Sequence, residues 1–485
     1  MKSALVNPEV VEQYLAREVS LGRVAGPFSS SPTANQLHVN RFGVIPKRGQ
    51  PGKWRLIVDL SHPSGGSVND GISGDDFSLS YSRVDDAIDF IMHEGRGTLL
   101  AKIDIRDAYR LIPVHPHDRY LLGMAWKNTL YVDLALPFGL RSAPCIFNRF
   151  AEGWHWILQH NYGVRFLLHY LDDFLTAGAP DSVECFQNLE AIKSSASSLQ
   201  VPLASEKVEG PSPTLTFLGI ELDTLQLVAR LPADKVNALR DLLNSWSTKR
   251  ACRRRELESL LGHLHHAAKV VYPGRPFLRR LTDLLRGTRD HSRFIRLNRE
   301  VRADLSWWSS FIRDWNGTSF FTSPGWSHLS DLQVSTDAAG ATGFGAYLDG
   351  LWFAGLWDTA QLSMSIAVKE LYPIVVAAHV WGHRWRGLRI QFLCDNRGVS
   401  EVISKRFCSD PALGGLLRSL FLAAAHHSFW VSACHVPGRL NSIADALSRS
   451  HFQTFRSLAP LASPVATHLP PQLLEELNSL LSSSK

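Results

Sequence analysis

Short apolar runs of strand length, separated by turn-forming residues, mark the first half of the chain. Two of them, VNRFGVIP and KWRLIVDL, flank a basic, glycine-rich stretch, and this pattern predicts a hairpin with a basic tip. TLLAKIDI predicts a strand that leads into a turn or a helix. The run FLLHYLDDFL predicts a buried hairpin. Strands and helices therefore alternate irregularly here, as in an α+β domain.

The elements between and after these runs are read from turn residues and helical periodicity. LYVDLALPFGLRSAPCIFNRF predicts a strand, a Gly/Pro turn and a helix. A helix from about 181 to 199 and a short strand pair around TFLGIELDTLQLVARLP are predicted next. Residues 232–315 show the helical period, with many Arg, Leu and Trp residues.

A second αβ pattern begins after TSPGWSHLSD. It starts with two or three strands separated by glycine turns and ends with the helix NSIADALSR. The final 35 residues are rich in Ser and Pro and then briefly amphipathic. With 485 residues the chain is too long for one ordinary core, so two to four domains are expected.

Composition narrows the class of protein. A hydrophobic content of 45% with 20% charged residues is typical of a globular chain, not a disordered one. No apolar stretch approaches the ~20 residues of a membrane span, and acidic residues interrupt the N-terminus where a signal peptide needs its apolar core. The six cysteines form no CxxC pair, which argues against a zinc knuckle or a disulfide framework. We therefore expect an intracellular protein of the cytoplasm or nucleus, not secreted and without a membrane partner.

The net charge of +6 is unevenly placed. Residues 230–300 contain 17 Lys and Arg against 7 Asp and Glu, a local excess of +10 that leaves the remainder at −4. A solvated helical face explains such a run, and so does a track for a nucleic-acid backbone. Charge alone leaves both interpretations open.

Asp172 and Asp173 are adjacent carboxylates inside an apolar run, where burial without compensation is costly. Hard divalent cations prefer oxygen ligands and would compensate them. Asp104, at the end of LLAKIDI, would complete a three-carboxylate site for two Mg²⁺ ions, an arrangement suited to phosphoryl transfer. Tyr109, five residues beyond Asp104, would crowd a ribose 2′ position. Lys53 and Arg55 would supply cations for a triphosphate.

The order of GKWRLIVDLS, KIDIRDAY, LPFGLRSAP, HYLDDFL and TFLGIEL resembles that of reverse transcriptases, from fingers through palm to primer grip. The resemblance implies that Asp104, Asp172 and Asp173 are metal ligands and that Tyr109 is a steric gate against ribonucleotides. It assigns the incoming triphosphate to Arg55, with Lys53 or Lys47 as a helper.

Three further substrate-binding residues follow from the same resemblance. Phe138 stands where retroviral enzymes commonly carry Gln, and Gly139 would let the backbone approach a nucleotide or template closely. Lys207 would protonate pyrophosphate, although a solvated lysine explains its position equally well.

Four acids of the second αβ pattern form another candidate site: Asp337, Glu370, Asp395 and Asp445. They are predicted on a strand, a helix, a strand end and a helix, and acids converging from such elements repel one another unless they hold cations. Their order and contexts resemble the ribonuclease H domain fused to reverse transcriptases, with two Mg²⁺ ions, or Mn²⁺ as the alternative. Retroviral domains carry a mobile His where this chain has Arg439, and we interpret His435 as structural.

The resemblance covers about residues 39–449 and implies an α+β right-hand polymerase (fingers, palm, thumb) followed by an α/β ribonuclease H-like domain. We expect an N-terminal extension (1–38), fingers and palm (39–228), a helical thumb and connection (229–328), the ribonuclease H-like domain (329–450) and a C-terminal tail (451–485).

The motifs are most similar to those of retrotransposons of the gypsy or DIRS kind, with DIRS favoured. The expected partners are an RNA template, a DNA primer or RNA–DNA hybrid, dNTPs, and polyprotein neighbours such as a recombinase or an integrase. Two alternatives stay open: a catalytically silent, host-retained nucleic-acid-binding protein, and a polymerase without active ribonuclease H.

Overall fold

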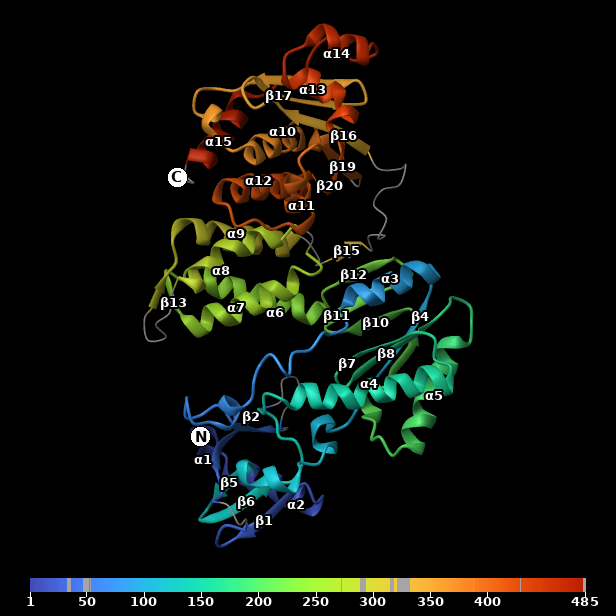
Figure 1. Cartoon of the computed structure of the whole chain (residues 1–485), viewed down its shortest axis with the longest axis vertical. Helices are drawn as coiled ribbons and strands as arrows, with labels where there is room; N and C mark the ends of the chain where they lie inside the picture. The colour runs from blue at the N-terminus through green and yellow to red at the C-terminus, as the bar shows by residue number, and fades with distance from the viewer. Residues whose placement is uncertain are drawn as a thin grey trace. The chain divides into compact units, whose positions relative to one another are not determined.

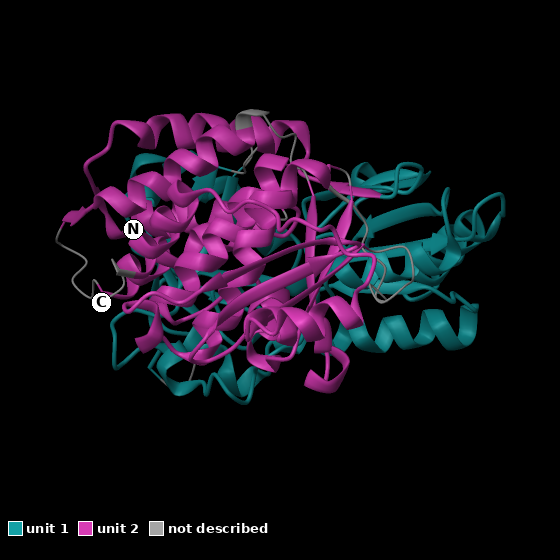
Figure 2. Ribbon diagram, turned by 90° about the horizontal axis from the view of Figure 1, so that it is seen from above, with its two compact units in different colours: residues 1–227 teal, residues 228–485 magenta. Residues whose placement is uncertain are grey.

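The chain forms two compact units, residues 1–227 and 228–485 (Figure 2). The finer, five-part division expected from the sequence stays a prediction. The computed structural model describes residues 1–32, 36–46, 52, 54–271, 273–287, 294–314, 318–320, 332–386, 388–427 and 429–482. Lys47 and Lys53, predicted to bind the triphosphate, lie outside the described residues.

The first part of unit 1 is a five-stranded sheet in the order β1-β6-β5-β2-β3, packed with two N-terminal helices (Figure 1). The strands are β1 Val24–Phe28, β2 Val39–Pro46, β3 Trp54–Asp59, β5 Gly123–Trp126 and β6 Thr129–Asp133, and the helices are α1 Lys2–Val6 and α2 Pro8–Ser20. β2 and β3 pair antiparallel, as the sequence predicts. Their alternating Val, Leu and Phe side chains are buried beside Val11 and Leu15 of α2.

The second part of unit 1 is a four-stranded sheet in the order β7-β8-β4-β9. Its strands are β4 Leu99–Asp104, β7 Leu167–Tyr170, β8 Asp173–Gly178 and β9 Glu209–Ser212; the helices are α3 Val84–Glu94, α4 Ala143–Tyr162 and α5 Glu184–Ser198. Phe147 of α4 and Ile192 of α5 share a buried cluster with Ile103 and Phe174 of the sheet. The two helices thus fix the strands that carry the predicted carboxylates. A hairpin of β10 Thr214–Phe217 and β11 Ile220–Asp223 follows.

The first part of unit 2 is helical, as predicted for 232–315. Its helices are α6 Ala233–Ser247, α7 Arg254–Ala267, α8 Arg279–Arg286 and α9 Arg299–Asp314. Leucines at helical spacing in α7 are buried, and Trp308 of α9 is fully enclosed. This part also has two pairs of three-residue strands, β12 Val228–Arg230 with β15 Thr318–Phe320 and β13 Ala251–Arg253 with β14 Phe294–Arg296. β12 lies inside the predicted TFLGIELDTLQLVARLP segment, whereas β13, β14 and β15 were not predicted, because such short strands leave no periodic signal.

The second part of unit 2 is a mixed sheet in the order β18-β17-β16-β19-β20, in which β19 lies parallel to β16 and β20. The strands are β16 Leu332–Ala338, β17 Gly343–Leu348, β18 Leu351–Leu356, β19 Arg389–Cys394 and β20 Trp430–His435. The helices are α10 Ile366–Trp381, α11 Arg397–Lys405, α12 Pro411–His427, α13 Ser442–Ser448, α14 Phe452–Leu458 and α15 Pro471–Ser482.

The segment after residue 450 takes part in the packing of this sheet and its helices. Leu477 and Leu481 of α15 belong to the same buried cluster as Tyr372 of α10 and Leu420 of α12. Phe455 of α14 packs against Trp352 of β18. None of the helices in the described part of the chain is long and apolar enough to cross a membrane.

Candidate active sites

The structure brings Asp104, Asp172 and Asp173 to one end of the β7-β8-β4-β9 sheet. Asp104 and Asp173 face each other in the antiparallel register of β4 and β8. Asp172 lies in the two-residue turn between Tyr170 and Asp173, which pair across β7 and β8. Leu171 adopts φ 56° in this turn, and the Asp172 carbonyl accepts a hydrogen bond of 3.0 Å from the Ile105 amide. Backbone pairing therefore fixes all three carboxylates.

Burial and mutual repulsion make the ionised forms of these acids costly. Burial, followed by the charges of Asp172 and Asp104, raises the pKa of Asp173 to about 6. Burial and the Asp104 charge also raise the pKa of Asp172. The Lys207 Nζ lies 2.7 Å from an Asp104 oxygen. Partial burial lowers the pKa of Lys207, but the hydrogen bond with Asp104 and the Asp104 charge raise it by more. The Lys207 ammonium therefore stays charged. The site is thus rich in oxygen donors and only partly neutralised.

Tyr109 lies beside this carboxylate group, in the short 3₁₀ helix Ala108–Leu111. Its ring packs against Phe138, with the ring centroids 5.1 Å apart, and the Arg55 guanidinium lies 5.3 Å from the Phe138 centroid. Burial, with a contribution from Asp172, raises the pKa of Tyr109 to about 12. Three of the predicted substrate-binding side chains therefore form one continuous layer.

The backbone of Gly139 lies close to the backbone carbonyl of Val58 in β3. Gly139 has φ 109°, and a Cβ atom there would lie 2.2 Å from the Val58 carbonyl oxygen. The Asn69 side chain donates 2.8 Å to the Gly139 carbonyl and accepts 2.8 Å from the Arg141 amide. Asn69, in the 3₁₀ helix Val68–Gly71, is a positioning residue that the sequence did not reveal, because it lies 70 residues before Gly139.

The second set of acids converges in unit 2. Asp337 is on β16, Glu370 on α10, Asp445 on α13, and Asp395 directly follows β19. Burial, followed by the charges of Asp337 and Asp395, raises the pKa of Glu370 to about 9. Burial raises the pKa of Asp337 to about 6, and Asp395 and Asp445 both contribute. Asp337 therefore interacts electrostatically with the other three predicted acids, and Glu370 also with Asp395.

Two side chains next to these acids were not predicted. The Ser448 hydroxyl, fully buried, donates 2.5 Å to an Asp337 oxygen. Ser448 is three residues beyond Asp445 on α13, so helical spacing was the signal that could have found it. Cys394 donates its thiol to Glu370, with Sγ and Oε2 3.7 Å apart. Arg439, at the place of the retroviral His, is exposed, and His435 at the end of β20 is exposed as well.

Both donor sets fit divalent cations, because carboxylate oxygens are the ligands that Mg²⁺ prefers. In the described part of the chain, one group of three or more ligand side chains has its ligand atoms all within 4.8 Å of one another: Glu370, Cys394 and Asp395. The three acids of unit 1 share a sheet end but are gathered less tightly.

Residues 45–222 match the protein family described as reverse transcriptase (RNA-dependent DNA polymerase). The matched range contains Asp104, Asp172, Asp173 and the aromatic layer around Tyr109. The chain contains a reverse transcriptase domain.

The relatives that this chain matches are polyproteins. The chain is 24% identical over 304 residues to the Gag-Pro-Pol polyprotein of Mason-Pfizer monkey virus. This match covers 61% of this chain and 15% of that protein. It is 23% identical over 465 residues to the transposon Tf2-3 polyprotein of Schizosaccharomyces pombe, covering 90% of this chain and 30% of that protein. The chain thus spans less than a third of the length of either relative. The DIRS or gypsy subtype stays a prediction.

Solved structures confirm the predicted fold class. The foamy viral protease-reverse transcriptase in complex with dsDNA has a TM-score of 0.51 and 15% identity, covering 88% of this chain and 83% of that one. A second structure of the foamy viral protein, the dRH form with dsDNA, has a TM-score of 0.52 and 16% identity, covering 88% and 69%. At these identities the likeness shows the fold, a polymerase followed by a ribonuclease H-like domain.

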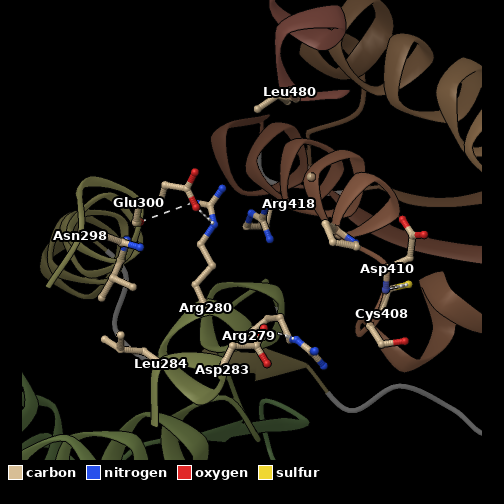
Figure 3. A pocket seen from close by; sticks show the side chains of 15 residues that line it. Arg279, Arg280, Asp283, Leu284, Asn298, Glu300, Cys408, Asp410, Arg418 and Leu480 are labelled. Carbon is tan, nitrogen blue, oxygen red and sulfur yellow. Dashed lines mark hydrogen bonds and ion pairs between the residues drawn. The ribbon is translucent and has the colours of Figure 1, made fainter. Parts of the chain in front are cut away.

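A separate pocket of about 410 Å³ in unit 2 has none of the predicted site residues in its lining. Figure 3 shows Arg279 and Arg280 of α8 on one side and Arg418 of α12 on the other. Arg279 pairs with Asp283 at 2.6 Å, and Arg280 with Asp304 at 3.2 Å. Burial and the Arg280 charge lower the pKa of Arg418. Carboxylates largely offset the basic lining of this pocket.

Proposed function

We propose that the reverse transcriptase chain is an RNA-directed DNA polymerase with a ribonuclease H activity that cleaves the RNA of RNA–DNA hybrids during retrotransposon replication. The observation that supports the polymerase is the pairing of Asp104 with Asp173 across β4 and β8, with Asp172 in the adjoining turn. This arrangement lies inside the range that matches the family.

In the polymerase site, Asp104, Asp172 and Asp173 would hold Mg²⁺, with Mn²⁺ as the alternative. Bound metal would supply charge neutralisation at the phosphorus and a lower pKa for the primer hydroxyl. Arg55, held over Phe138, would bind the triphosphate of the dNTP through charge-assisted hydrogen bonds. The Tyr109 ring, wedged against Phe138, would exclude a 2′-hydroxyl. Lys207, kept protonated beside Asp104, would donate a proton to the leaving pyrophosphate.

In the nuclease site, Asp337, Glu370, Asp395 and Asp445 would hold the divalent ions. Bound metal would supply a nucleophilic hydroxide from water near neutral pH. The Ser448 hydroxyl would keep Asp337 oriented through its 2.5 Å hydrogen bond. Arg449, 2.7 Å from Asp445, would have to release that carboxylate when it binds metal. Its exposure makes this release inexpensive.

Primer extension on an RNA template tests the polymerase. We expect Asp173→Asn to abolish dNTP incorporation, because one carboxylate of the group is lost. Glu190→Gln, an exposed acid paired with Lys193 on α5, is the matched control and should extend like wild type. Background incorporation by wild type and both variants would refute the polymerase and favour the silent nucleic-acid-binding protein.

Hybrid cleavage tests the nuclease separately. We expect Asp395→Asn to lose cleavage of the RNA strand, and Asp349→Asn, in the exposed turn between β17 and β18, to retain it. A wild-type chain that extends primers but leaves hybrids intact would establish a polymerase without working ribonuclease H.

The helices α6 to α8 are proposed to bind the phosphates of the template–primer duplex. If so, affinity falls steeply with salt, because each phosphate neutralised releases counterions. Titration of a labelled RNA–DNA hybrid at several salt concentrations measures the slope, and a flat response would remove this assignment.

A further inference from the structure

We propose that Cys394, Glu370 and Asp395 form a binding site for a thiophilic divalent cation of the Zn²⁺ or Cd²⁺ class. The site would overlap the proposed nuclease site, since it shares Glu370 and Asp395 with it. Its role in regulation rests on the proposed function, whereas metal binding itself does not.

The distances fit one shared ion. The ligand atoms of the three residues all lie within 4.8 Å of one another, and the Cys394 sulfur is 3.7 Å from a Glu370 oxygen. Tetrahedral zinc with a sulfur at about 2.3 Å and an oxygen at about 2.0 Å separates those two atoms by about 3.5 Å. The cation would replace the thiol proton and the proton that Glu370 carries below its raised pKa of about 9, and both protons would pass to solvent.

The surroundings of Glu370 also favour a cation. Its residue is 4% exposed, and among the described residues no lysine or arginine lies within ion-pair distance of its carboxylate. The thiol of Cys394 is the partner that this part of the chain provides. A buried carboxylate with so weak a donor leaves most of its desolvation cost uncompensated.

The Cys394 sulfur is a buried thiol without bound metal, since burial, followed by the charge of Glu370, raises its pKa. The backbone amide of Asn396 donates to Cys394 Sγ at 3.4 Å, and Asn396 is the N-cap of α11. This donation offsets only part of that rise, so the incoming cation itself would have to displace the thiol proton. Sulfur ligation selects Zn²⁺ or Cd²⁺ over Mg²⁺, because soft ligands prefer soft ions.

The consequence is selective inhibition. A Zn²⁺ ion held by Cys394 would withdraw Glu370 and Asp395 from the ions that cleavage requires. Primer extension depends on a different set of acids, Asp104, Asp172 and Asp173. The proposed polymerase site includes no cysteine ligand. Zinc would therefore act on the nuclease before the polymerase.

Cd²⁺ titration of the full chain, followed by the ultraviolet thiolate-to-metal charge-transfer absorption, tests the site directly. The background is a Cys408→Ser/Cys434→Ser chain, since these two cysteines are the more accessible ones. We expect a saturable absorption band that disappears in Cys394→Ser and in Glu370→Gln. A band of equal size in Cys394→Ser, or no band in the background chain, would overturn the proposal. Circular dichroism verifies that each variant is folded.

Zinc inhibition of hybrid cleavage is the second arm, with each variant compared with its own zinc-free rate. We expect the half-inhibitory Zn²⁺ concentration to rise at least about tenfold in Cys394→Ser. Equal inhibition in both chains would refute the regulatory role. If no chain cleaves hybrids but the Cd²⁺ band depends on Cys394, the proposed nuclease function fails and the metal site stands.

Discussion

Arg110 is expected to be essential for the stability of unit 1, and Arg110→Ala tests this. The Arg110 side chain is 4% exposed and lies next to Tyr109 in the sequence. Its guanidinium lies 3.0 Å from Glu18, 2.7 Å from Asp133 and 2.9 Å from the Ala135 carbonyl. It therefore joins α2, β6 and the segment that carries the proposed steric gate.

The magnitude follows from what the alanine leaves behind. Removing one partner of a buried ion pair costs about 3–5 kcal/mol, because the other charge stays buried without compensation. Here two carboxylates, Glu18 and Asp133, would be left, so we expect the upper part of this range. Burial already raises the pKa of Asp133 to about 6 against the opposing charge of Arg110. Without the arginine, Asp133 would take up a proton more readily, and the deficit should shrink as the pH falls.

Hydrogen exchange of the full chain measures the effect, because unfolding of a chain with two units is not a single two-state transition. We expect faster exchange in peptides covering 24–28 and 129–133. Arg106→Ala is the matched control: its pair with Glu206 at 3.1 Å is exposed, at 49% and 61%, and should contribute no more than about 1 kcal/mol. Equal effects of the two substitutions, or less than about 1 kcal/mol for Arg110→Ala, would refute the reasoning.

Three other results are expected. Ser448→Ala should slow hybrid cleavage about tenfold or more without affecting primer extension, since hydrogen bonds that orient metal ligands have effects of this size. Equal cleavage rates in wild type and Ser448→Ala would contradict this. His155 should contribute a loss of about 1–3 kcal/mol to unit 1 between pH 6.5 and 4, because burial, followed by the charge of His169, lowers its pKa to about 4 and the unfolded chain binds the proton first. Asp133 and Asp173, whose pKa values burial raises to about 6, act in the opposite direction, so the test is a difference between chains. Acid should destabilise His155→Phe less than wild type in thermal unfolding, and an equal acid effect would count against the reasoning. Leu477→Ala should cost about 2–5 kcal/mol in the thermal or denaturant unfolding of unit 2, and the exposed control Glu475→Ala close to nothing.

The sequence was sufficient for the elements that carry a periodic or chemical signal. Asp172 and Asp173 stand inside an apolar run, and that conflict predicted a hairpin with a polar end, which β7 and β8 form. Asp104 could be placed opposite them because it ends an apolar strand of similar length. The acids of the second site were predicted from their order along the chain and from the different elements expected to carry them.

The remaining features depend on contacts between distant segments. Asn69 holds the Gly139 loop across 70 residues, and no local pattern marks such a pair. Gly139 appeared suited to a close approach by substrate, but its φ of 109° and the Val58 carbonyl give it a packing reason. The role of Cys394 was predicted only from the spacing of the cysteines along the chain. That spacing gives no information about the contact between the Cys394 thiol and Glu370.

The place of α15 in the core also has a consequence for synthesis on the ribosome. Leu477 and Leu481 fill the same cluster as residues of β16, which begins at Leu332. Unit 1 can bury its own clusters while translation continues, because domains generally fold as they emerge. The cluster around α10 and α12 must wait until about 150 further residues have followed β16 out of the exit tunnel. During this interval apolar side chains of α10 are uncovered, so this is the stage at which a chaperone would matter most to the nascent chain.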